Sequence, residues 1–361
     1  MKRKIKLSEV SVIIIVLGAI LTCIFCYNQL VTETMSSVHR CIYSVIPSLY
    51  APMFTACLIT ESNLHNFIGK LFSPVSRFIF KMPPEIFAVF LLSNVSGYPS
   101  GIKLLEGLRK KGKISEDDFK RYSLFCFSAG PAFVAGVVSS GLFSCVNVGL
   151  IIFISTFTAN LIIAFILGIG QKVPDVEVTH VRIKADIVIC SARNAASGMI
   201  HMCTMITAFT LIKVLLCQTG ILNLGAQFLG STLMHNQNNC HASLLSVLEI
   251  TNISQFYIYS LENIPVITAL FSFGGICVVS QICSISEGKI KAGQFIFYRI
   301  FSSIVSYFIS MILCKIFIRN ITIPASAFVV NSSEQSLFPS LILLIMSIML
   351  MIFSSSKQKS R

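Results

Sequence analysis

Residues 85–103 read EIFAVFLLSNVSGYPSGIK and decide the architecture of this chain. The apolar part, residues 85–94, is too short to cross a bilayer, because a spanning helix takes about 20 apolar residues. Turn-forming residues follow at 96–101, and basic residues begin again at Lys103. Basic residues collect on the cytoplasmic side of a membrane protein, and Lys81 precedes the segment as Lys103 follows it. We therefore predict a re-entrant hairpin, which enters and leaves the membrane on one side.

The composition places the hairpin in a polytopic, all-α membrane protein. The chain has 361 residues, of which 54% are hydrophobic and 12% charged, and its mean hydropathy is +0.80. A soluble domain carries about 25% charged residues, so soluble, disordered and coiled-coil classes are excluded. The net charge of +13 comes from basic residues between apolar segments, which is typical of cytoplasmic loops. We therefore expect a lipid bilayer, and no nucleic acid, as a partner.

Outward from the hairpin, apolar segments predict about eight crossings, with both chain ends in the cytoplasm. An amphipathic segment at 66–82 predicts a helix lying on the cytoplasmic face. Lys213 and Lys315, near the ends of spans, are expected to extend toward the headgroups. The predicted spans are residues 10–27, 41–60, 122–145 (broken at 128–131), 148–169, 199–217, 264–285 (broken at 272–275), 295–318 and 337–353.

The second half repeats the order of the first. Residues 244–253 form another short apolar segment with a polar break at 249–254, and Ser93-Asn94-Val95-Ser96 resembles Thr251-Asn252-Ile253-Ser254. With three crossings in each half, the second repeat must be inverted relative to the first. The predicted divisions are an N-terminal helix and amphipathic stretch at 1–36, a first repeat at 37–170, a cytoplasmic hinge at 171–186, an inverted second repeat at 187–319, and a C-terminal helix with a basic tail at 320–361.

Inverted repeats with broken helices are typical of secondary transporters, whose sites lie between the breaks near the midplane. Glu249 stands out because an ionisable residue inside an apolar segment is rare and usually functional. It could serve as a proton or cation site or accept a hydrogen bond from solute; alternatively, it caps a helix or pairs with a base. The glycines could serve close packing alone. The candidate substrate-binding residues are Asn94, Ser96, Gly97, Tyr98, Pro99, Gly101, Ser128, Gly130, Pro131, Glu249, Thr251, Asn252, Ser272, Gly274 and Gly275.

No catalytic, cofactor or metal site is predicted, and we expect no enzyme activity. His235, Cys240 and His241 could bind a soft metal, but an uncharged extracytoplasmic loop accounts for them better. The expected ligand is an unidentified polar solute, with or without a coupling ion, and an oligomer is compatible with the sequence.

Residues 92–103 (LSNVSGYPSGIK), together with 125–134 (FCFSAGPAFV), resemble the sporulation integral membrane protein family of the YlbJ type. Those proteins carry the nucleoside-recognition or Gate domain. The resemblance implies a role in endospore formation, in a bacterial cell membrane such as that of the mother cell or forespore, with transport inferred by analogy. The alternative is a non-transporting component needed for spore cortex or coat assembly. Ala129 interrupts the Ser-Gly-Pro run, and no glycine follows the second break at 252–255.

Overall fold

The computed structural model describes residues 16–18, 20–21, 23–143, 145–171, 173, 181, 185–232, 237–256 and 261–317. Within these ranges every regular element is a helix, as the composition predicts. The C-terminal helix at 337–353, most of the hinge at 171–186, His235 and residues 1–15 of the N-terminal segment lie outside the described residues.

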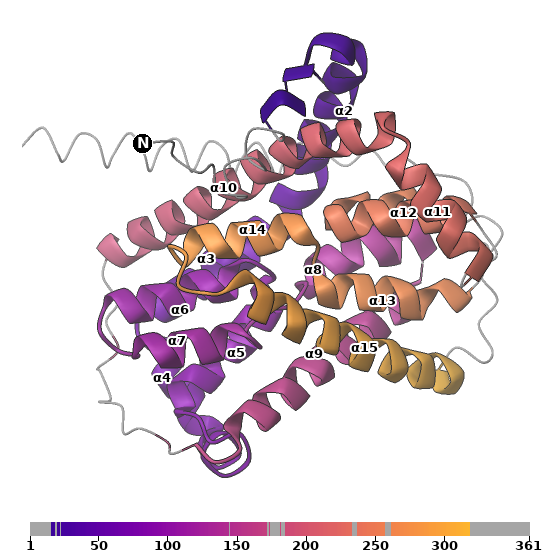
Figure 1. Ribbon diagram of the computed structural model, residues 1–361. Helices are drawn as coiled ribbons and strands as arrows, with labels where there is room; N and C mark the ends of the chain where they lie inside the picture. The colour runs from indigo at the N-terminus through magenta and orange to yellow at the C-terminus, as the bar shows by residue number, and fades with distance from the viewer. Residues whose placement is uncertain are drawn as a thin grey trace, which may run out of the picture.

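The helices follow one another in a regular order along the chain (Figure 1). Elements written η are π-helical or 3-10 turns. They are α2 (Tyr27–Arg40), η1 (Cys41–Val45), α3 (Ile46–Glu61), α4 (Leu64–Leu71), η2 (Val75–Ile79), α5 (Pro84–Ser96), α6 (Ser100–Lys110), α7 (Glu116–Ser123), α8 (Pro131–Val134), η3 (Ala135–Phe143), α9 (Val146–Gly168), α10 (Ala185–Gln218), α11 (Ile221–Thr232), α12 (Gln237–Leu248), η4 (Ile250–Gln255), η5 (Leu261–Asn263), α13 (Ile264–Phe273), α14 (Ile276–Ile285) and α15 (Ala292–Phe317).

Five helical stretches of the described residues are long and apolar enough to cross a membrane, which supports a multi-pass membrane protein. They are Tyr27–Glu61, Val146–Gly168, Ala185–Gln218, Ile264–Ile285 and Ala292–Phe317. The total of about eight crossings stays a prediction, as do the predicted divisions of the chain.

The predicted span at 122–145 is not a continuous helix. Helix α7 ends at Ser123, the backbone is irregular through residue 130, and only the one-turn α8 and the π-helical η3 follow. The break predicted at 128–131 is therefore present, but it begins earlier and extends further. The amphipathic segment at 66–82 likewise divides into α4 and η2, with Phe67, Leu71 and Phe78 exposed.

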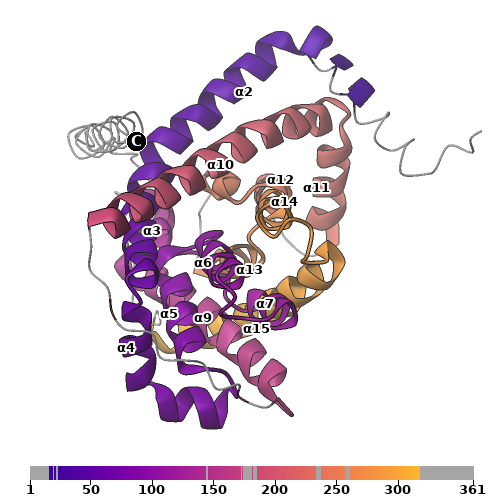
Figure 2. The same cartoon turned by 90° about the vertical axis from the view of Figure 1, so that its left-hand side faces the viewer.

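Long helices frame the molecule and the short ones fill its centre. Helix α10 packs on α2 and α3, while α15 packs on α9 and α13. Figure 1 shows α10 crossing above the other helices, and Figure 2 shows α6, α13 and α14 inside the frame of longer helices. Two local pairs, α4 with α5 and α11 with α12, flank this centre.

Helices α5 and α6 pack against each other and form the predicted hairpin. Helix α5 is 13 residues long and ends at Ser96. Gly97 then adopts a φ of +77°, and α6 begins at Ser100. The chain thus reverses direction within three residues, as the turn-forming sequence predicts.

The hairpin is packed so closely that the two glycines of α6 should respond oppositely to alanine. A Cβ at Gly101 would lie 2.3 Å from the Cys126 carbonyl oxygen, whereas a Cβ at Gly107 would meet no atom within 4 Å. We expect Gly101→Ala to destabilise the protein by about 1–3 kcal/mol through overpacking. Gly107→Ala should be neutral or stabilise by up to about 1 kcal/mol. Thermal unfolding in detergent measures both, and equal melting temperatures would contradict this packing.

Candidate solute-binding site

The tip of the first hairpin rests on the irregular segment between α7 and α8. The Tyr98 amide donates to the Ser128 carbonyl at 2.7 Å, and its ring stacks on Phe127 with 4.8 Å between centroids. A Cβ at Gly97 would lie 2.9 Å from the Gly130 nitrogen, and a Cβ at Gly130 would lie equally close to the Val95 oxygen. Both glycines are therefore required by a close backbone contact, which is the packing role that the sequence left open.

Arg299 on α15 holds the same irregular segment from the other side. Its guanidinium is fully buried and donates to the carbonyls of Leu124 and Phe127 and to Asn160 Oδ1, and it lies over the Phe127 ring at 4.8 Å. Asn160 in turn donates to the Phe127 carbonyl at 2.6 Å. The carbonyls that the helix break leaves free thus find donors inside the protein, as a membrane interior requires.

Sequence reasoning missed Arg299, although its signal was present. An arginine within the apolar run at 295–318 is as rare as Glu249 within its own short segment, and the same rule selects both.

The second break forms around Glu249, which is 4% exposed. Its carboxylate caps η4 by accepting from the Thr251 amide at 2.9 Å, from the Thr251 hydroxyl and from Asn252 Nδ2 at 3.2 Å. A Cβ at Gly275, in the break between α13 and α14, would lie 3.3 Å from the Ile250 nitrogen. The capping role considered for Glu249 is therefore present.

The two breaks meet at a closed central cavity of about 20 Å³. Tyr98 from the first tip, Glu249 and Thr251 from the second, and Gln281 from α14 supply its polar atoms. The remaining wall is mainly apolar: Val45, Leu49, Phe133, Met202, Ile206, Ile250, Cys277 and Val278. Three of the predicted candidate residues thus share one cavity, and Gln281 is an addition that the sequence did not single out.

The other candidates lie around the cavity without lining it. Asn94 donates to the Phe90 carbonyl, Ser272 bonds Ser302 across 2.7 Å, and a Cβ at Gly274 would meet the Phe127 ring. The remaining ones form the turns and breaks themselves: Ser96, Gly97, Pro99, Gly101, Ser128, Gly130, Pro131, Asn252 and Gly275.

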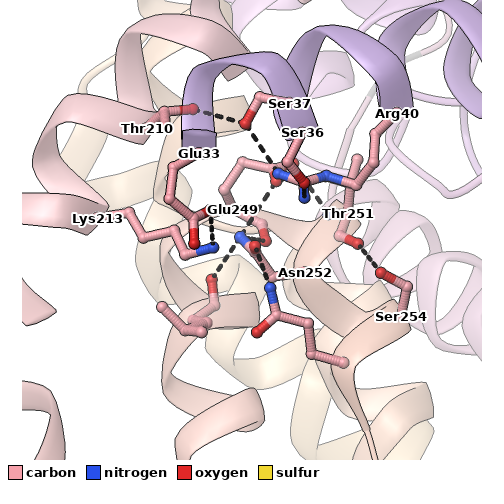
Figure 3. A network of polar contacts seen from close by, with 12 residues as sticks. Glu33, Ser36, Ser37, Arg40, Thr210, Lys213, Glu249, Thr251, Asn252 and Ser254 are labelled. Atoms are coloured by element: carbon pink, nitrogen blue, oxygen red, sulfur yellow. Dashed lines mark hydrogen bonds and ion pairs between the residues drawn. The ribbon is translucent and has the colours of Figure 1, made fainter. Parts of the chain in front are cut away.

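Behind Glu249, a polar network joins α2 to α10 (Figure 3). Lys213 pairs with Glu33 at 2.7 Å, so its predicted extension toward the headgroups is wrong: the ammonium finds a carboxylate inside the bundle. Arg40 donates to the hydroxyls of Ser36 and Ser37. Both cations act on the Glu249 carboxylate through space, and these two bases and two acids carry no net charge together.

A larger hollow of about 400 Å³, which we call the basic vestibule, lies on the same helices as the central cavity. Its walls are Cys57, Thr60 and Glu61 of α3, Lys103 to Lys111 of α6, Asn194 to His201 of α10, and the end of α14. The central cavity uses Leu49, Met202 and Gln281, which lie on α3, α10 and α14 in adjoining turns. The two hollows are therefore consecutive along three shared helices.

Ion pairs hold the outer end of the basic vestibule. Glu287, after α14, contacts Lys110 at 2.8 Å and Lys289 at 3.0 Å. Hydrogen bonds from both lysines lower the pKa of Glu287 to about 2. A third hollow, of about 380 Å³, lies at the second hairpin and is lined by Asn238, His241, Ala242, Ser254, Gln255 and Phe256.

The comparisons with known proteins give one related sequence. The chain is 29% identical over 156 residues to the sporulation integral membrane protein YlbJ of Bacillus subtilis (strain 168). This chain is similar to a sporulation membrane protein. The match covers 43% of this chain and 37% of the relative. No family model matches the chain, and no solved structure does.

The role of Arg299 predicts a graded series of substitutions. Arg299→Lys keeps the charge but cannot reach the Leu124 and Phe127 carbonyls and Asn160 together, so we expect a loss of about 1–2 kcal/mol. Arg299→Met leaves these acceptors without a donor and should cost more, about 2–4 kcal/mol. Thermal unfolding in detergent measures the series, with the exposed Lys291→Met as the control. Two variants as stable as the control would contradict the role.

Proposed function

We propose that this protein is a secondary-transporter-like carrier that moves a polar solute across a membrane during endospore formation. The observation that carries the proposal is the closed cavity where two broken segments meet, placed directly above a wide vestibule on the same three helices. A carrier needs such a site, closed in one state and reached from one side at a time.

The order of elements supports two related halves. Helices α3, α4, the α5–α6 hairpin, the broken segment before α9, and α9 itself correspond in sequence order to α10, α11, the α12–η4 turn, the broken α13–α14 span, and α15. The contacts follow the same plan, because α3 packs on α10, α9 packs on α15, and α4–α5 matches α11–α12. We infer an inverted repeat of the Gate type.

The sporulation role comes from the relative, whose name describes a sporulation integral membrane protein. The five apolar helices agree with an integral membrane protein. A bacterial membrane is the proposed location, with the α6–α7 loop on its cytoplasmic side because Lys110, Lys111 and Lys113 lie there.

The runner-up is a membrane component that supports spore cortex or coat assembly without transport. The two proposals differ at the closed cavity, since only the carrier depends on its polar groups.

A solute-uptake screen in proteoliposomes tests the carrier directly. We expect uptake by the wild-type protein and by Glu116→Gln, whose carboxylate is exposed on α7. Glu249→Gln should lose most of it, because the neutral amide weakens the cap of η4 at the cavity. Gly97→Leu should abolish it, since a side chain there meets Gly130 and Leu49. If both variants insert normally and support full uptake and full sporulation, the cavity is not the transport site.

The barrier between the two hollows gives a second test. Met53 is 1% exposed, lies on α3 between Leu49 and Cys57, and its side-chain end occupies the space that a Cβ of Gly198 would fill. We expect Met53→Ala to open the cavity toward the basic vestibule. In a protein whose sole cysteine is Cys277, labelling by a small thiol reagent should then accelerate several-fold.

Met82→Ala is the matched control, because Met82 is also buried but lies outside both hollows. Equal labelling rates in the two variants would show that Met53 is not the barrier.

A further inference from the structure

The central cavity holds more polar capacity than the protein itself uses. Tyr98 is 5% exposed and Gln281 is 1% exposed, and neither the Tyr98 hydroxyl nor Gln281 Oε1 has a hydrogen-bond partner. Buried polar atoms without a partner cost free energy, so they indicate something that binds to them. Both residues line the cavity with Glu249.

The chemistry of these atoms defines the ligand. Gln281 Oε1 and the Glu249 carboxylate can only accept or coordinate, while the Tyr98 and Thr251 hydroxyls can do either. A set of carboxylate, amide and hydroxyl oxygens is hard and suits a hard cation. The cavity excludes an organic solute by size, because about 20 Å³ accommodates a single ion or a single water.

The surrounding charges limit the ion to one of low charge. Glu249 is the carboxylate at the cavity, while Lys213 is paired with Glu33, and Arg40 is bound to Ser36 and Ser37. These four charged groups already balance, so a bound cation leaves one net positive charge. A divalent ion would be strongly repelled by Arg40 and Lys213, whereas a monovalent ion would bind and leave readily.

We propose that the cavity closed by Tyr98, Glu249, Thr251 and Gln281 is a binding site for a small monovalent cation, Na⁺. Helix α12 ends at Leu248 beside the site and directs its negative end there, which adds to the attraction. Only the role of this ion in coupling rests on the proposed carrier function. The binding itself can be measured without transport.

Thermal unfolding of the full chain in detergent tests the site, with NaCl compared with KCl and choline chloride at equal ionic strength. A ligand that binds the folded state raises the melting temperature, and we expect a rise of about 2–4 °C with Na⁺ alone. Tyr98→Phe keeps the stack on Phe127 and loses only the hydroxyl, so it should weaken the response. Gln281→Ala and Glu249→Gln should abolish it.

The matched control is Glu85→Gln, because Glu85 Oε2 is a buried, unpartnered oxygen at a different small hollow. It should keep the full response to Na⁺. No response in the wild-type protein would mean that a trapped water occupies the cavity, and would overturn the assignment. A response that persists in Gln281→Ala and Tyr98→Phe, or one that follows pH and not Na⁺, would overturn it as well.

The uptake assay separates this inference from the carrier function. Uptake that runs equally well in potassium, with no sodium effect on stability, leaves the carrier intact and contradicts the sodium site. Sodium-dependent stability without uptake of any solute supports the site and contradicts the carrier.

Discussion

Helix ends buried at the centre of a membrane protein need hydrogen-bond partners that lipid cannot supply. This constraint organises the whole centre of the structure. The carbonyls released between α7 and α8 are bound by Arg299, Asn160 and the Tyr98 amide. The free amides at the start of η4 are bound by the Glu249 carboxylate. Because each break is satisfied by residues from another element, the breaks hold the short helices together.

The same constraint explains why the cavity forms. The Tyr98 amide and ring are fixed on Ser128 and Phe127, which leaves the phenol hydroxyl extending into the cavity without a partner. Glu249 is fixed by its cap, so its position is rigid although it lies in an apolar segment. Rigid polar atoms in a dry cavity give an ion a preorganised environment, and this is the physical basis of the proposed sodium site.

The sequence predicted the features that depend on local pattern. The first hairpin follows from a short apolar segment between basic flanks, and Gly97 and Glu249 follow from a turn motif and a rare buried acid. Gln281 was missed because a neutral amide in an apolar helix gives no charge signal. The basic vestibule could not be predicted, since α3, α6, α10 and α14 meet only in three dimensions. The span at 122–145 was placed too regularly, because its many apolar residues conceal the irregular backbone that Arg299 stabilises.

The central claim is that two hairpin tips from opposite membrane faces meet at one cavity. The most direct measurement is the sidedness of labelling at two positions in a cysteine-free protein, with Lys110→Cys at the base of the first hairpin and Asn238→Cys at the base of the second. Both side chains are exposed at their hairpin bases. We predict that an impermeant thiol reagent labels Lys110→Cys only from the cytoplasmic side and Asn238→Cys only from the opposite side. Labelling of both positions from the same side would contradict the inverted arrangement.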